Sequence, residues 1–312
     1  MNALVILSII LLFHPSISAL LVSTPADPLI IRGNGRVHSS LVRNLTFYTR
    51  YMSIAYCSLD QINAFDCIDC KEQELAGTHS AIAFNESLTG TQGYAAINDL
   101  HKFIILSVRG RANSINTHAT LKFTYTSPFP LSTWARDAKV HGGFYHAFTG
   151  IKSKIQNAIL TLAHKRSEYD VVFSGHSMGG AMSTMAALEA MRPDGGYLIS
   201  LRKPSQIRIY TVGQPRVGNA AYANLINSIG FKHVYRAVNY IDPVPHLPSR
   251  YLGFRHHLRE IYLDQKGQAL YCNDVLHHGE DTNCANLIKP GDYNASYHRT
   301  YFGIEVGRGS RC

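Results

Sequence analysis

Residues 171–180 constrain the fold more than any other stretch, because they read Val-Val-Phe-Ser-Gly-His-Ser-Met-Gly-Gly. The apolar run and the residues that follow the glycines predict a buried strand, a tight turn and a helix over about 178–191. The turn carries Gly-x-Ser-x-Gly, with Ser177 between Gly175 and Gly179, which is the spacing of a nucleophile elbow. Glycine is expected on both sides, since a β-carbon in so sharp a turn would strike the neighbouring strand or helix.

Ser177 would then stand at the N-terminus of a helix, where the free N–H of Met178 can bind a developing oxyanion. The motif alone is weak evidence, because background glycine and serine usage produces it in roughly one chain in ten of this length. The strand before it and the small residues Gly180, Ala181 and Ser183 after it make this copy more specific. Its interpretation as a reactive serine depends on partners elsewhere in the chain.

Strands and helices alternate around this stretch, which predicts an α/β fold with a mainly parallel central sheet flanked by helices. Residues 102–108 are almost continuously apolar, as expected of a central strand that is buried on both faces. Residues 111–131 show little periodicity, and the C-terminal tail reads as loop. The other expected elements are helices over 42–57 and from 140–144 to about 165, strands over 77–85, 91–98, 207–212 and 234–238, and a hairpin of 259–263 with 269–272.

The first 19 residues have the layout of a signal peptide, with an apolar run at 4–13 followed by small residues. The run is too short for a membrane span. Because no Lys or Arg precedes it, a buried strand and an uncleaved anchor are alternatives. We expect a secreted chain with a single domain over 20–312, and the even number of six cysteines suits an oxidising compartment. Acceptor patterns for N-glycosylation begin at Asn44, Asn85 and Asn294.

The chain carries 30 Lys and Arg against 21 Asp and Glu, which gives a formal charge of +9. A basic surface favours anionic partners, and outside the cell these are lipid particles or membrane surfaces rather than nucleic acid. The sequence also has no basic cluster interleaved with aromatic residues. Ordinary solubility charge explains the excess equally well, and we expect a monomer.

A reactive serine needs a base to take its proton and an acid to orient that base, in the chain order serine, acid, histidine for an α/β hydrolase. Asp242 fits the acid, because it follows the strand over 234–238 and precedes a proline, which keeps it extended. The alternative acids have weaker structural context; they are Asp264, Asp274, Asp281 and Asp292.

Six histidines follow Asp242, and the later ones are preferred, since the base usually lies on a loop beyond the acid. His246 is too close behind the acid. His277 and His278 read as a solvated loop pair rather than a metal site, since no Cys, Asp or Glu completes a convincing ligand set. Spacing leaves three candidates for the base, which are His256, His257 and His298.

Four blocks of sequence are more specific together than any one of them. They read Gly-His-Ser-Met-Gly-Gly at 175–180, Val-Gly-Gln-Pro-Arg-Val-Gly-Asn at 212–219, Val-Asn-Tyr-Ile-Asp-Pro-Val-Pro-His-Leu-Pro at 238–248 and His-Arg-Thr-Tyr-Phe-Gly at 298–303. In this order and with these separations they resemble the class 3, fungal-type triacylglycerol lipases. The resemblance extends over about residues 42–312.

This resemblance implies an α/β-hydrolase fold and a secreted serine ester hydrolase that acts on lipids without a metal or an organic cofactor. The family's acid is the aspartate before x-Val-Pro-His-Leu-Pro, here Asp242, and its base is the histidine before x-x-Tyr-Phe, here His298. Backbone N–H groups of Met178 and Arg111 would form the oxyanion hole. Glu260, His256 and His141 would be structural.

The resemblance also implies a disulfide pairing, although spacing alone allows many. It joins Cys57 to Cys312, Cys67 to Cys70 and Cys272 to Cys284. Considered without it, Cys67-Ile-Asp-Cys70 could be a redox or metal pair, which the signal peptide argues against.

Two features depart from the family pattern. Arg111 stands where these lipases have Ser or Thr, so the supporting hydroxyl is absent, unless Ala112 or Asn113 takes that position. The segment 112–121 occupies the place of the lid but has no tryptophan or phenylalanine, so we do not expect strong interfacial activation. Short-chain or feruloyl-type esterases, phospholipases and a non-catalytic lipid-binding protein are therefore alternatives to a triacylglycerol lipase.

Overall fold

An eight-stranded sheet runs through the centre of the computed structural model, which describes residues 35–110, 124–129, 133–274, 279–307 and 310–312. The strand order is β1-β2-β3-β6-β7-β9-β11-β12. Strands β3, β6, β7, β9 and β11 are parallel to their neighbours in that series, whereas β1, β2 and β12 join antiparallel at the two edges. The strands are β1 Thr78–Glu86, β2 Thr91–Asn98, β3 Phe103–Val108, β6 Asp170–His176, β7 Ile207–Val212, β9 His233–Asn239, β11 Glu260–Leu263 and β12 Ala269–Tyr271.

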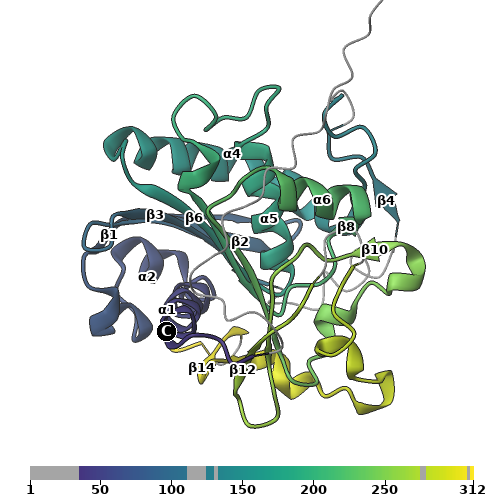
Figure 1. The fold of residues 1–312 in the computed structure, drawn as a ribbon. Helices are drawn as coiled ribbons and strands as arrows, with labels where there is room; N and C mark the ends of the chain where they lie inside the picture. Colours follow the sequence, from purple (N-terminus) through teal and green to yellow (C-terminus); the bar gives the residue numbers. More distant parts are fainter. Residues whose placement is uncertain (1–34, 111–123, 130–132, 275–278, 308–309) are drawn as a thin grey trace, which may run out of the picture.

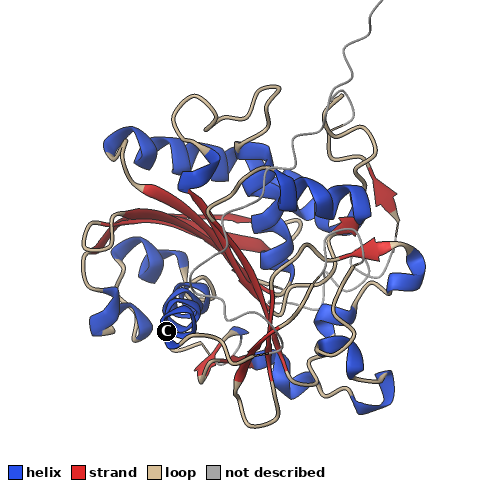
Figure 2. Ribbon diagram, in the orientation of Figure 1, coloured by secondary structure: helices blue, strands red, loops and turns tan. Residues whose placement is uncertain are grey.

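Helices cover both faces of this sheet (Figures 1 and 2). On one face lie α4 (Gly142–Lys165), α5 (Met178–Ala190) and α6 (Ala220–Ser228), and on the other lie α1 (Ser39–Ile54) and α2 (Leu59–Ala64). The predicted α/β architecture with a mainly parallel sheet flanked by helices is therefore confirmed. Among the described residues, no helix is both long and apolar enough to cross a bilayer.

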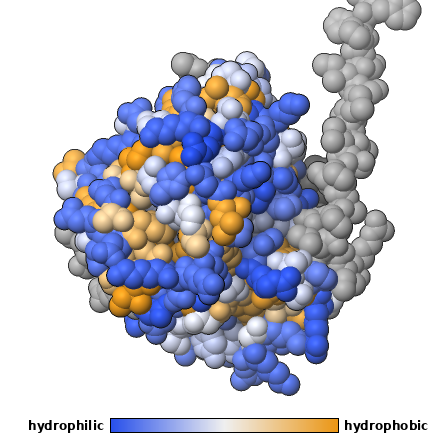
Figure 3. Space-filling view, turned by 90° about the vertical axis from the view of Figure 1, so that its left-hand side faces the viewer, coloured by the Kyte–Doolittle hydropathy of each residue, from blue (hydrophilic) through white to orange (hydrophobic). Residues whose placement is uncertain are grey.

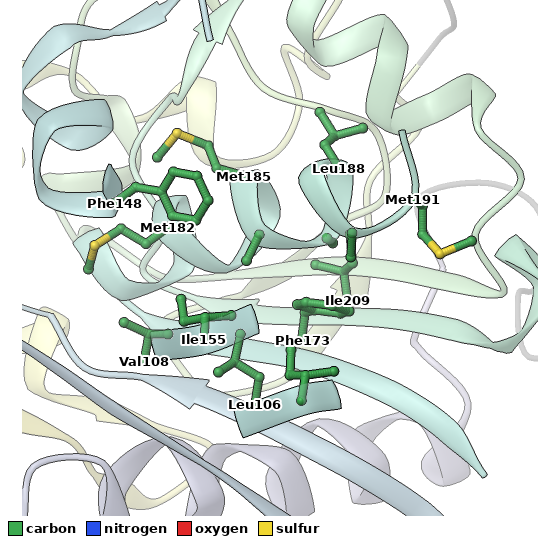
Figure 4. Packing of buried hydrophobic residues seen from close by; sticks show 14 of the residues in the cluster. Leu106, Val108, Phe148, Ile155, Phe173, Met182, Met185, Leu188, Met191 and Ile209 are labelled. Carbon is green, nitrogen blue, oxygen red and sulfur yellow. The ribbon is translucent and has the colours of Figure 1, made fainter. Parts of the chain in front are cut away.

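Two apolar clusters fix these layers. The first packs methionines of α5, such as Met182 and Met185, against Phe148 of α4 and against strand residues including Phe173 (Figure 4). The second packs α1 against the opposite face of the sheet, where Tyr48 stacks on Tyr210 with ring centroids 4.4 Å apart. Every residue of α5 is buried, so the helix that carries the elbow is held on all sides.

Some helix boundaries and several short elements differ from the sequence-based expectation, among them α2, which stands where a loop was expected. The first helix spans 39–54 rather than 42–57, and α4 begins at Gly142 because Val140–His141 forms strand β5. A second small sheet, in the order β10-β8-β5-β4, was not predicted. Its other strands are β4 Tyr125–Thr126, β8 Gly218–Asn219 and β10 Phe254–Arg255. Each has two residues, which is too few to show a periodicity.

The tail is also more ordered than the predicted loop. It contains the 3₁₀ helix η9 (Ala295–Arg299) and the hairpin of β13 (Thr300–Tyr301) with β14 (Ile304–Glu305). The remaining 3₁₀ helices are η1 Asp69–Lys71, η2 Gln73–Leu75, η4 Pro204–Gln206, η5 Val244–His246, η6 Arg250–Leu252, η7 Ala285–Leu287 and η8 Pro290–Asp292.

Disulfides connect the tail to the body of the fold. Cys57, three residues after the end of α1, is bonded to Cys312, and Figure 1 shows the C-terminus beside α1. The other two bonds join Cys67 to Cys70 and Cys272 to Cys284. These are the pairs that the family resemblance implied. Viewed from the side of the β1 edge, the surface is largely hydrophilic, with apolar side chains in separate patches between polar ones (Figure 3).

Candidate active site

Ser177 occupies a strained turn between β6 and α5. Its backbone has φ 58° and ψ −133°, a conformation that a residue with a β-carbon rarely adopts. The flanking glycines explain how the turn fits. A β-carbon on Gly179 would lie 2.0 Å from the carbonyl oxygen of Val108, and one on Gly175 would lie 2.4 Å from the carbonyl carbon of Gly179. The packing thus requires glycine at both positions.

Asp242 is completely buried, three residues after the end of β9. Its Oδ1 accepts a hydrogen bond from the N–H of Val244 at 2.8 Å, and its Oδ2 accepts one from the hydroxyl of Tyr301. Oδ2 also lies 2.8 Å from Nδ1 of His298. The carboxylate is therefore held from three sides, with one oxygen directed at an imidazole.

His298 on η9 connects Asp242 to Ser177. Its Nε2 is 2.8 Å from the Ser177 hydroxyl oxygen, while its Nδ1 faces Asp242. Because a carboxylate can only accept, Nδ1 carries the proton and Nε2 presents its lone pair to the serine. This arrangement can remove the proton of the serine hydroxyl and stabilise the imidazolium that results.

The sequence is similar to those of known lipases. Residues 105–252 match the family described as lipase (class 3). The lipase of Rhizomucor miehei is 32% identical over 275 residues, which are 86% of this chain and 70% of that lipase. The chain belongs to the class 3 lipase family.

Further similarities place this class 3 lipase among acylglycerol hydrolases. Secreted mono- and diacylglycerol lipase 1 of Fusarium solani is 29% identical over 228 residues, which are 71% of this chain and 63% of that protein. A solved structure, reported as a serine protease triad forming the catalytic centre of a triacylglycerol lipase, is 31% identical. It has a TM-score of 0.75 and covers 88% of this chain and 99% of its own. The chain is thus a carboxylic ester hydrolase of a family that hydrolyses acylglycerols.

Three other histidines that the sequence singled out, His141, His256 and His257, have different surroundings from His298. His256 is buried and its Nε2 donates to the carbonyl of Pro245 at 2.8 Å. Burial lowers its pKa well below the usual range, and burial together with the Arg236 charge lowers the pKa of His257 to about 3. His141 caps α4 by accepting the N–H of Phe144. These contacts suit structural histidines, and the lowered pKa values keep His256 and His257 neutral.

The alternative acids belong to turns and ion pairs. Asp264 accepts N–H groups within the β11–β12 turn, and Asp281 accepts those of its own loop. Asp274 and Glu260 both pair with the buried Arg236. Asp292 ends the 3₁₀ helix η8 and is exposed. None of these described contacts reaches Ser177 or His298.

Several predicted residues lie outside the described part of the chain. They include Arg111, the lid segment 112–121, and the pair His277 and His278.

Sequence reasoning missed four residues that contact the site. Tyr301 binds Asp242, and Gly213 lies against the ring of His298. Tyr56 and His176 form a second group beside Ser177. Three of them, His176, Gly213 and Tyr301, were inside the blocks that carried the resemblance, so they could have been singled out. Nothing near Tyr56 in the sequence distinguishes it.

Proposed function

We propose that this class 3 lipase is a secreted triacylglycerol lipase that works through Ser177, His298 and Asp242. The observation that carries the proposal is the unbroken series of hydrogen bonds from Ser177 through His298 to Asp242, with both of its contacts at 2.8 Å. The relatives that are named for triacylglycerol and diacylglycerol hydrolysis support the substrate class.

In this mechanism, the Ser177 oxygen attacks the ester carbonyl as its proton passes to Nε2 of His298. Asp242 holds the imidazole by Nδ1 and stabilises the positive charge. His298 then gives the proton to the leaving alcohol, which breaks the ester bond and leaves an acyl group on Ser177. Water, deprotonated by the same imidazole, attacks the acyl-enzyme and releases the fatty acid.

The oxyanion would bind to two backbone N–H groups. The first is that of Met178, which starts α5, where no intrahelical acceptor exists for it. The N–H of Gly110 is already bound to the Tyr56 hydroxyl at 2.8 Å. We therefore assign the second donor to the next residue, Arg111, whose main chain provides the N–H despite the missing hydroxyl.

The experiment that tests the substrate compares hydrolysis of emulsified trioleoylglycerol, emulsified dioleoylglycerol and a soluble short-chain ester, with Ser177→Ala as the blank. We expect trioleoylglycerol to be cleaved at a rate at least equal to that of dioleoylglycerol. Cleavage of dioleoylglycerol alone would replace the proposal with a diacylglycerol lipase. Activity on the soluble ester alone would indicate an esterase, and no rate above the blank would indicate a lipid-binding protein.

Secretion and domain structure are part of the same proposal. The layout of residues 1–19 supports removal of a signal peptide, after which residues 20–312 would act as one domain at a lipid–water interface or an anionic membrane surface. N-terminal sequencing of the protein recovered from the medium of an expressing cell tests this. An N-terminus near residue 20 is expected, and retention of Met1 would contradict it.

A further inference from the structure

The hydroxyl of Tyr56 joins the two sides of the candidate active site. It accepts the N–H of Gly110 at 2.8 Å, just after β3, and it lies 2.6 Å from Nδ1 of His176. The opposite nitrogen of the same ring, Nε2, lies 2.9 Å from the carbonyl oxygen of His298. The Tyr56 hydroxyl and the His176 ring thus connect the main chain before Arg111 to the main chain of the proposed base.

The direction of each hydrogen bond follows from the chemistry of the groups. A carbonyl oxygen can only accept, so Nε2 of His176 carries the proton and donates to His298. Nδ1 then has a lone pair and accepts a hydrogen bond from the Tyr56 hydroxyl. Burial, with a smaller effect from the charge of His298, lowers the pKa of His176 well below the usual range, so the ring stays neutral. Every donor and acceptor in the series is then matched.

The segment around Tyr56 is itself fixed against the sheet. The side-chain amide of Gln92 donates to the carbonyls of Ala55 and Cys57, at 3.0 and 2.7 Å, on either side of Tyr56. The main-chain carbonyl of Gln92 also accepts the N–H of Arg109 at 3.0 Å. One residue of β2 therefore sets the position of Tyr56 relative to the end of β3.

Close packing leaves these groups little freedom. A β-carbon on Gly110 would lie 2.7 Å from the Tyr56 hydroxyl and 2.7 Å from Cβ of Ser177. The rings of His176 and His298 have centroids 4.5 Å apart. A shift of Tyr56 would therefore be passed to the main chain at 110 and to the imidazole of His298.

We propose that Tyr56 and His176 are positioning residues that hold the Gly110 main chain and His298 in register with Ser177. This inference rests on the proposed function. The two residues act through their neighbours, because their own polar atoms are occupied by Gly110 and by the His298 carbonyl. Their contribution is to keep the oxyanion-binding main chain and the base aligned as Ser177 is acylated and released, where a displacement of about 1 Å can cost a hundredfold in rate.

The test removes one hydroxyl. With a soluble short-chain ester, Tyr56→Phe is expected to lower kcat by about 10- to 100-fold and to change KM by less than about threefold. The matched control is Tyr94→Phe, because Tyr94 is buried on the α1 side of the sheet and its hydroxyl donates to the Tyr51 carbonyl at 3.0 Å, away from Ser177. That variant should lower the unfolding temperature while its kcat stays within about twofold of wild type.

Two variants of His176 provide a readout that a general loss of packing would not give. His176→Gln keeps an N–H that can donate to the His298 carbonyl, whereas His176→Leu has none. We expect the glutamine variant to retain about tenfold more kcat than the leucine variant. In the double variant Tyr56→Phe/His176→Leu, kcat should match that of the worse single variant, because both changes break one series of bonds.

The inference is overturned if Tyr56→Phe keeps kcat within twofold of wild type, if the two His176 variants have equal kcat, or if the double variant shows the product of the two single effects. Ser177→Ala separates this outcome from failure of the proposed function. An inactive Ser177→Ala with unaffected Tyr56→Phe removes only the positioning role, whereas an active Ser177→Ala removes the proposed mechanism itself.

Discussion

The ring of His298 lies directly against the backbone of Gly213. A β-carbon at position 213 would be 2.9 Å from Cε1 and 3.0 Å from Nδ1 of the imidazole. Gly213 follows β7 with φ +60°, and its N–H donates to the carbonyl of Ala237 at 3.0 Å. This hydrogen bond anchors the end of β7 to β9. The ring of His298, the proposed base, packs against the backbone held in this way.

Gly213→Ala is therefore expected to lower kcat by about 100-fold, because the methyl group displaces the imidazole from Ser177 and Asp242. The left-handed backbone should also cost about 1 to 2 kcal/mol of stability. Gly267→Ala is the matched control, since Gly267 has φ +74° but nothing within 4 Å of its added β-carbon. The control should lose stability and keep its activity. Equal kcat for the two variants would show that His298 tolerates the methyl group.

The buried His246 is expected to make the folded protein less stable at acid pH. Burial and the nearby Arg216 lower its pKa to about 4, below the value near 6.5 of an unfolded histidine. The unfolded state therefore binds more protons between about pH 6.5 and 4, and stability is lost as the pH falls through that window. Above about pH 6.5 the residue is neutral in both states, so it does not make the stability depend on pH.

His246→Phe should remove that loss while keeping an aromatic ring against Tyr293, which now stacks on His246 with centroids 4.7 Å apart. Urea unfolding of both proteins at pH 7 and pH 5 measures this loss of stability. Relative to the variant, the wild type should become less stable by about 2 kcal/mol between the two pH values. A difference between the proteins that is independent of pH would contradict the neutral, buried state of His246.

The disulfides should contribute different amounts to the free energy of unfolding, because they close loops of different length. Cys57 and Cys312 are 255 residues apart, whereas Cys67 and Cys70 are three apart. By loop entropy, replacing the first pair with alanine should cost up to roughly 5 kcal/mol of unfolding free energy, and replacing the second roughly 2 kcal/mol. Guanidinium unfolding of the two double variants tests the order. A larger loss for the short loop would mean that its local contacts, not chain entropy, dominate.

The long elements could be predicted from the sequence because each carries its own signal. The apolar run before Ser177 predicted β6, and the parallel sheet followed from the alternation of strands and helices. The second small sheet could not be predicted, since two-residue strands such as Gly218–Asn219 are defined by their partners and not by a pattern. Its existence depends on contacts between segments far apart in the chain.

In the candidate active site, too, some residues could be predicted from local sequence and others could not. Asp242 was favoured by the strand and the proline that flank it, but spacing could not choose among His256, His257 and His298. That choice came from the family resemblance, and the structure gives the physical difference: only the third of these has its Nε2 directed at Ser177. Tyr56 is 120 residues from His176 in sequence, so no local pattern could connect the two.

The most direct test of the central claim is the reaction of the protein with a serine-directed alkyl phosphonate, followed by peptide mass spectrometry and a parallel esterase assay. We predict one phosphonyl group per chain, on the peptide that contains Ser177, with activity lost in proportion to labelling. His298→Ala should label far more slowly, because the serine then lacks its base. Loss of activity without label on Ser177, or an unlabelled chain that is fully active against ester, would contradict the claim that Ser177 is the nucleophile.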